Sequence, residues 1–119
     1  MNGQGNTMEL KVDLVSLTEE EEVFQILFEE DPNREDTPYL LLQRAFLDEE
    51  DDPAPPCYLE THEDGSTRPY TRPDAELTEN RLVLYLPPPG NETIIVHFRA
   101  TNRQFKKIKR LLAIILPET

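Results

Sequence analysis

The sequence is poor in cysteine, tryptophan, glycine and basic residues. Among 119 residues it has one cysteine, no tryptophan and four glycines, and its 12 basic residues face 24 acidic ones. The lone cysteine, Cys57, cannot form an internal disulfide, and it excludes a zinc site built from several thiolates. A single thiol is compatible with a reducing compartment.

Membrane and export signals are also missing. The longest hydrophobic runs lie at residues 39–42, 82–86 and 111–116, and each is far shorter than the roughly 20 residues of a membrane-spanning helix. The first ten residues have neither the basic region nor the apolar region of a signal peptide. We therefore expect a cytoplasmic protein without a membrane partner.

The composition is that of one small globular domain. The chain contains 37% hydrophobic residues, 30% charged residues and eleven prolines, which favours short elements joined by polar loops. Residues 1–7 are rich in glycine, asparagine and glutamine, and we expect a disordered N-terminal tail there. Residues 8–117 are expected to form a single α+β domain.

Most of this domain is predicted to be β-structure. Hydrophobic and polar residues alternate over Met8–Leu14, the pattern of a half-buried strand. Further strands are predicted at Val23–Phe28, Tyr39–Phe46, Cys57–Thr61, Arg81–Leu86 and Thr93–Arg99. The last two are expected to pair antiparallel, Glu19–Glu22 to form a turn, and 66–79 to be an irregular connection. A helix over Glu19–Phe28 remains an alternative to the strand there.

One helix is predicted, at Thr101–Leu116. Thr101 and Gln104 have the spacing of a capping box, and Pro117 ends the helix. An apolar stripe is formed by Phe105, Ile108, Leu112 and Ile115, with Leu111 beside it. Strands followed by one helix predict a curved antiparallel sheet of five to six strands, with the C-terminal helix packed on one face.

Charge is divided unevenly along the chain. Residues 9–96 contain 23 acidic and 6 basic side chains, whereas residues 97–119 contain 6 basic and one acidic side chain. In the predicted helix four basic residues fall outside the apolar stripe and form its solvent side: Lys106, Lys107, Lys109 and Arg110. No aromatic residue lies among them, and a net charge of −12 opposes nucleic-acid binding. We expect no nucleic-acid partner.

No arrangement of residues indicates catalysis. Cys57 and His62 are five residues apart, so on one strand they would be about 16 Å apart and face opposite sides. His97 alternates with apolar neighbours and is expected to be a surface or half-buried histidine. The chain has no phosphate-binding glycine loop, and the acids at 48–52 lack the spacing of an EF-hand. We expect a non-enzyme with no metal and no cofactor.

Two acidic runs are the candidate partner-binding segments. They consist of Asp48, Glu49, Glu50, Asp51 and Asp52, and of Glu19, Glu20, Glu21 and Glu22. Acidic runs also occur as solvated loops that only keep a protein soluble, and this interpretation stays open. The functional interpretation is electrostatic capture of a basic protein, because long-range attraction accelerates the encounter.

The segment Tyr39–Asp51 reads YLLLQRAFLDEED, and Tyr58-Leu59-Glu60 follows after a short gap. This pattern resembles bacterial polymorphic-toxin immunity proteins, specifically the immunity protein 10-like family. The resemblance implies a cytoplasmic protein without catalysis that binds and neutralises a cognate toxin domain. The positions that match the family pattern are Gln43, Arg44, Asp48, Glu49 and Asp51.

These features predict a non-enzymatic binding protein. Under the resemblance it is an immunity protein that neutralises its cognate toxin through acidic surface loops. The alternative is a small structural or regulatory module that acts as a homodimer through an exposed sheet edge or helix face.

Overall fold

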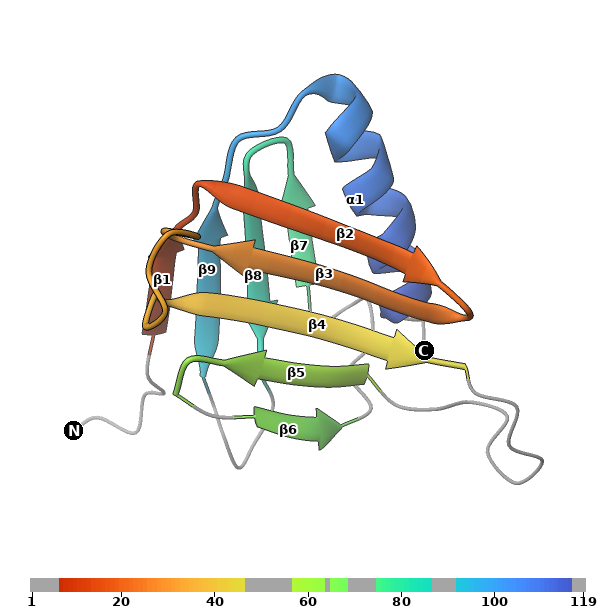
Figure 1. The fold of residues 1–119 in the computed structure, drawn as a ribbon, viewed down its shortest axis with the longest axis horizontal. Coiled ribbons are helices and arrows are strands. Elements are labelled where there is room, and N and C mark those ends of the chain that lie inside the picture. The colour runs from red at the N-terminus through yellow and green to blue at the C-terminus, as the bar shows by residue number, and fades with distance from the viewer. Residues whose placement is uncertain (1–6, 47–56, 64, 69–74, 87–91, 117–119) are drawn as a thin grey trace.

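The computed structural model describes residues 7–46, 57–63, 65–68, 75–86 and 92–116, which form nine strands and one helix (Figure 1). In chain order these are β1 (Thr7–Lys11), β2 (Leu14–Glu20), β3 (Val23–Glu29), β4 (Tyr39–Ala45), β5 (Cys57–Thr61), β6 (Gly65–Arg68), β7 (Ala75–Thr78), β8 (Arg81–Tyr85), β9 (Thr93–His97) and α1 (Asn102–Ile115). The predicted α+β class, with a helix after the strands, is confirmed.

The strands form two sheets rather than the one curved sheet that the sequence predicts. The five-stranded sheet has the order β2-β3-β4-β5-β6 and is antiparallel throughout. The four-stranded sheet has the order β1-β9-β8-β7, and its β1–β9 pair is parallel. In Figure 1 the four-stranded sheet and α1 lie behind the five-stranded sheet, and α1 contacts β2, β3 and β4.

The chain passes from one sheet to the other at Val12 and Asp13. The Val12 N–H donates to the carbonyl of His97 at 2.8 Å, whereas the Asp13 N–H donates to the carbonyl of Glu29 at 3.0 Å. The strand predicted over residues 8–14 is therefore divided between β1 and the start of β2. Period-2 alternation shows which face a residue occupies but not which strand it pairs with, so the change of sheet is absent from the pattern.

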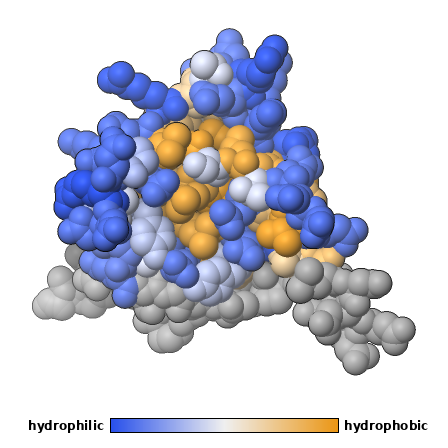
Figure 2. Space-filling view, viewed as in Figure 1, coloured by the Kyte–Doolittle hydropathy of each residue, from blue (hydrophilic) through white to orange (hydrophobic). Residues whose placement is uncertain are grey.

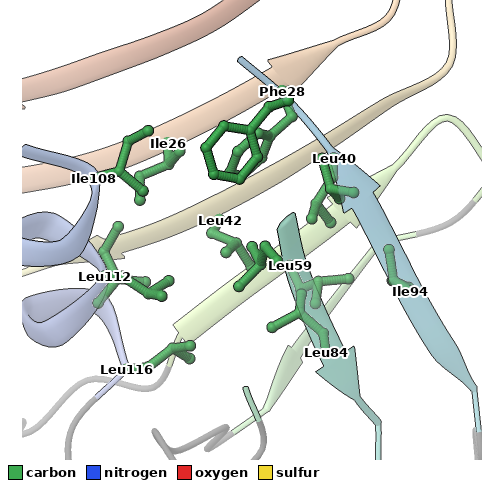
Figure 3. Close-up of a cluster of buried hydrophobic side chains, with 14 of the residues drawn as sticks. Ile26, Phe28, Leu40, Leu42, Leu59, Leu84, Ile94, Ile108, Leu112 and Leu116 are labelled. Atoms are coloured by element: carbon green, nitrogen blue, oxygen red, sulfur yellow. The ribbon is translucent and has the colours of Figure 1, made fainter. Parts of the chain in front are cut away.

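The hydrophobic core fills the space between the five-stranded sheet and the layer made by the four-stranded sheet and α1 (Figure 3). Its members come from all three units and include Ile26, Phe28, Leu40, Leu42, Leu84, Ile94, Ile108 and Leu112. Each such side chain contributes about 1.5–3 kcal/mol by leaving water. On β3, β4 and β5 the core takes alternate residues, so the remaining residues of these strands face away from it.

The predicted strands within β3, β4, β5, β8 and β9 are confirmed, and β8 pairs antiparallel with β9. Two local assignments are corrected. Glu19 and Glu20 belong to β2, so the turn is confined to Glu21–Glu22, and the helix alternative is wrong. Residues 66–79 are not simply irregular, because they include most of β6 and all of β7. Both strands have four residues, too few for a periodic pattern to be recognised.

The helix begins at the predicted cap. The Thr101 hydroxyl accepts a hydrogen bond from the Gln104 N–H at 3.1 Å, and the Gln104 side chain accepts one from the Thr101 N–H at 2.9 Å. At the other end, Nη1 of the buried Arg44 donates to the carbonyl of Ile114 at 3.0 Å. A strand thus supplies a cation to the negative end of the helix.

Candidate protein-binding surface

The structure places one of the two acidic runs. Asp48, Glu49, Glu50, Asp51 and Asp52 lie outside the described residues. Glu19, Glu20, Glu21 and Glu22 are exposed at the end of β2 and in the turn to β3. The N–H of Phe46 donates to the carbonyl of Glu22 at 2.8 Å. The chain therefore leaves β4, just before the other acidic run, beside this turn.

The turn between β2 and β3 has an unfavourable backbone for its residues. Glu20 pairs with Val23, so the loop consists of Glu21 and Glu22 alone. Their φ values are 48° and 65°, the positive values of a type I′ turn, which asparagine and glycine adopt most readily. Two glutamates are thus held where their Cβ atoms are disfavoured, and a strained conformation of this kind is a reason to examine a site for function.

Glu19 differs from its neighbours because it is paired inside the molecule. Arg110 of α1 donates two hydrogen bonds to its carboxylate, at 2.9 and 2.6 Å. The hydrogen bond from Arg110 lowers the pKa of Glu19, assisted by the charges of Arg110 and Lys107. Glu19 therefore joins β2 to α1. In the described part of the chain no ion pair is found for the other three carboxylates of the run, those of Glu20, Glu21 and Glu22.

The outer face of the five-stranded sheet has a half-buried apolar centre. Leu27 of β3 and Leu41 of β4 are direct cross-strand partners, and neither belongs to the core or packs against it. Other apolar residues at outward positions are Leu14, Val23, Tyr39, Ala45 and Tyr58. Figure 2 shows the hydrophobic patch on this side, with hydrophilic side chains around it. No described element covers the patch (Figure 1).

This outer face is also acidic. On β2 to β5 its outward positions include three glutamates, Glu20, Glu29 and Glu60, and neither lysine nor arginine. Gln25 and Gln43 are cross-strand partners and add uncharged polar groups next to the leucines. The face therefore combines an apolar centre with negative charge, and a basic partner would complement it.

Two tyrosines and a glutamate form a hydrogen-bonded group on the same face. The hydroxyl of Tyr39 donates to Glu60 Oε2 at 2.5 Å, and that of Tyr58 donates to Oε1 at 2.6 Å. These bonds, that of Tyr39 first, lower the pKa of Glu60. The bond to Glu60, together with burial, raises the pKa of Tyr39 to about 12. The rings are therefore held in place, and tyrosine is enriched at protein interfaces because it offers contact area with a polar tip.

Cys57, His62 and His97, the residues considered for catalysis, have separate hydrogen-bond partners or are buried, and they do not form one site. Cys57 is buried, and burial raises the pKa of its thiol to about 12, which removes the thiolate that a nucleophile needs. His62 accepts the Tyr39 N–H at its Nδ1, at 3.3 Å, and His97 is hydrogen bonded to Glu9. Among the described residues no group of three or more potential metal ligands is found, and no helix could span a bilayer.

Comparison with known proteins does not assign a family. No protein-family model matches the chain, and no curated protein matches it significantly. The candidate surface is therefore inferred from its geometry and charge.

Sequence reasoning found β3, β4 and β5, but it missed most of β2 and all of β6, and it did not find the surface that these strands form. The run over β4 is apolar on both faces, which is typical of a central strand. The structure covers only the face with Leu40 and Leu42. The sequence did contain a signal that the opposite face is uncovered, because polar side chains interrupt it: Gln43 on β4 and Gln25 on β3. Such groups are rare on a face that is fully buried.

Proposed function

We propose that this chain is a non-enzymatic binding protein that captures a basic protein on the outer face of its five-stranded sheet. The single observation that supports this most is the Leu27–Leu41 pair at the centre of an acidic face that no described element covers. Exposed apolar patches with a polar rim are typical of interaction sites. Removing the patch from water supplies affinity, and the surrounding carboxylates guide the encounter.

The more specific proposal is that the partner is a cognate toxin domain and that binding neutralises it in the cytoplasm. The support is the resemblance to immunity proteins, since its two segments include β4 and part of β5, which lie in this sheet. Of the matching positions, Gln43 faces outward in the candidate surface. Arg44 faces inward and contacts the end of α1, so we assign it a structural role rather than a partner contact.

A homodimer formed through the same face is less favourable. Two copies would bring Glu20, Glu29 and Glu60 of each chain against those of the other, and like charges across an interface oppose association. We therefore expect a monomer until the basic partner is present, and light scattering of the pure protein tests this. A dimer that dissociates when Leu41 is replaced would favour the alternative of a homodimeric module.

The decisive experiment compares two matched substitutions. Leu41→Lys changes a half-buried outward residue in the middle of the five-stranded sheet, and Ile95→Lys does the same in the four-stranded sheet. The tagged protein is used to recover basic partners from a lysate at low salt, and the recovered protein is then purified and its affinity measured. We expect Leu41→Lys to abolish binding and Ile95→Lys to retain it.

Salt dependence provides the second measurement. Because the proposal attributes the encounter to charge, the association rate should fall as salt is raised, whereas the apolar contacts persist. Equal binding by Leu41→Lys and the wild type, with both folded by circular dichroism, would contradict the proposed surface. An association rate that does not respond to salt would contradict electrostatic capture.

A further inference from the structure

A row of basic side chains crosses the outer face of the four-stranded sheet at one end. His97 of β9 is the direct partner of Lys11 on β1 and of Arg81 on β8. The core side of the same strands is occupied by their buried neighbours Leu10 and Val96, so the row faces away from the core. In Figure 1 this end lies at the top, where β1 and β9 end and β8 begins.

The row lines a depression of about 800 Å³, which also includes Arg99, Asn80 and Asp13. This volume is within the range of small-molecule sites, about 300–1,000 Å³. Hydrogen bonds of the backbone fix its walls, because the N–H of Phe98 donates to the carbonyl of Asn80 at 3.0 Å. The depression therefore lies where the ends of the strands meet the segments that follow them, and backbone hydrogen bonds join these segments.

The charge of this depression is unusual for so acidic a protein. Acidic residues outnumber basic ones by 24 to 12, yet in the described part of the chain no ion pair joins Lys11, Arg81 or Arg99 to a carboxylate. Arg34 and Arg110, by comparison, are each paired with an acid. Lys11 and Arg81 lie on the two strands that flank β9, and Arg99 follows β9. Like charges are therefore gathered at this end of the sheet, and a bound anion would reduce their repulsion.

The lining contains one acid, Asp13, against these three cations. The carboxylate of Glu9 is hydrogen bonded to Nε2 of His97, so it is held by the ring rather than by one of the three cations. The excess of positive charge is thus local, on the side of the molecule opposite to the acidic face of the five-stranded sheet. An anion would find both charge and hydrogen-bond donors here.

We propose that this depression binds a small phosphate-bearing anion. Two arginines and one lysine line the depression from three segments, and guanidinium groups bind phosphate through pairs of parallel hydrogen bonds. The side-chain amide of Asn80 supplies further donors at the same end. A phosphoryl group has enough oxygen atoms to accept bonds from several of these donors together, which a single carboxylate does not.

Titration with inorganic phosphate and with pyrophosphate tests the site, by calorimetry and by amide chemical shifts at constant ionic strength. We expect saturable one-site binding of pyrophosphate at millimolar concentrations, with shifts grouped around Lys11, Arg81 and Arg99. The double variant Arg81→Gln with Arg99→Gln should weaken binding at least about tenfold, which corresponds to about 1.4 kcal/mol. The matched control is Lys106→Gln with Lys107→Gln, which removes the same charge from the exposed side of α1 and should leave the affinity unchanged.

Two results would overturn the proposal. One is the absence of saturable binding of either anion, and the other is an equal loss of affinity in the control, which would show a general response to net charge. The substitutions lie at exposed positions, and circular dichroism verifies that the variants fold. The site is independent of the proposed capture function, because Leu41→Lys should abolish partner binding and leave pyrophosphate binding intact.

Discussion

Arg110 of α1 donates hydrogen bonds from both terminal nitrogens to the two carboxylate oxygens of Glu19 on β2, at 2.9 and 2.6 Å. The basic helix and the acidic body, which the sequence presents as separate regions of charge, meet in this pair. The pair also links α1, which packs against β2, β3 and β4, to the edge strand of the five-stranded sheet. A partner that approaches the β2–β3 turn meets three carboxylates and one ion pair.

The Glu19–Arg110 pair should make a small contribution to stability that depends on pH and salt. The folded-state pKa of Glu19 is below the ordinary value of 4.5, so the contribution is present above that value and is lost as the pH falls through the folded pKa. Urea denaturation of Glu19→Gln and the wild type should therefore differ at neutral pH and converge in acid and at high salt. Glu20→Gln is the control. A difference in the free energy of unfolding between Glu19→Gln and the wild type that does not change with pH would contradict the role of the ion pair.

The Tyr39–Glu60 bond should make Tyr39 titrate late. Its pKa is raised from 10.0 to about 12, so the stabilising contribution is complete below pH 10 and is lost as the pH rises through the folded pKa. Ultraviolet titration of tyrosinate should show this late ionisation in the wild type, and Glu60→Gln should return Tyr39 towards the ordinary value. Tyr39→Phe assigns the signal. A late transition that persists in Tyr39→Phe would refute the assignment.

Asparagine and glycine should fit the turn at Glu21 and Glu22 better than the two glutamates do. The double variant Glu21→Asn with Glu22→Gly should raise the free energy of unfolding by about 1–2 kcal/mol because both φ values are positive. The control is Glu79→Gly in the two-residue β7–β8 turn, where φ is not positive, and it should give no gain. If the carboxylates contact the partner, the stabilised variant should bind it more weakly. Denaturation and binding are measured on the same variants.

Replacing Arg44 by alanine should lower the free energy of unfolding more than replacing Arg34 by alanine. It is buried, donates to the carbonyl of Ile114, and lies over the ring of Phe46 at 4.6 Å. Arg44→Ala should cost about 1.5–3 kcal/mol, measured by urea denaturation. Arg34→Ala, in the exposed pair with Asp36, should cost less than about 1 kcal/mol. Equal effects would show that the contact with the helix end is not stabilising.

Charge reversal in the acidic run should slow partner capture. Asp48→Lys with Glu49→Lys should reduce the association rate far more than it changes stability, because the proposal gives these charges a role in the long-range encounter. Glu35→Lys with Asp36→Lys changes net charge equally in the β3–β4 loop, at the opposite end of β3 from the β2–β3 turn (Figure 1). Stopped-flow kinetics separates the two. Similar rates for both variants would exclude a special role of this run.

Much of the local structure could be predicted because it depends on neighbouring residues. The capping box of Thr101 and Gln104 and the apolar stripe of α1 are set within a few residues, and both are present. The strands from Val23 and Tyr39 follow their alternation. Most of β2, the short strands β6 and β7, and the exchange of sheets at Val12 and Asp13 were not predicted, because pairing between distant strands leaves no periodic signal.

The candidate surface shows the same division. The sequence alone determines an acidic series of strands followed by a basic amphipathic helix. Hydrophobic periodicity and local charge predict this order, because both are properties of residues close together in the chain. Only the tertiary structure decides that Glu19 is paired with Arg110, that Leu27 and Leu41 meet on an uncovered face, and that Lys11 and Arg81 flank His97. Each of these relationships joins residues from separate strands or from a strand and the helix, and their distance in space is set by sheet register and packing rather than by their separation along the chain.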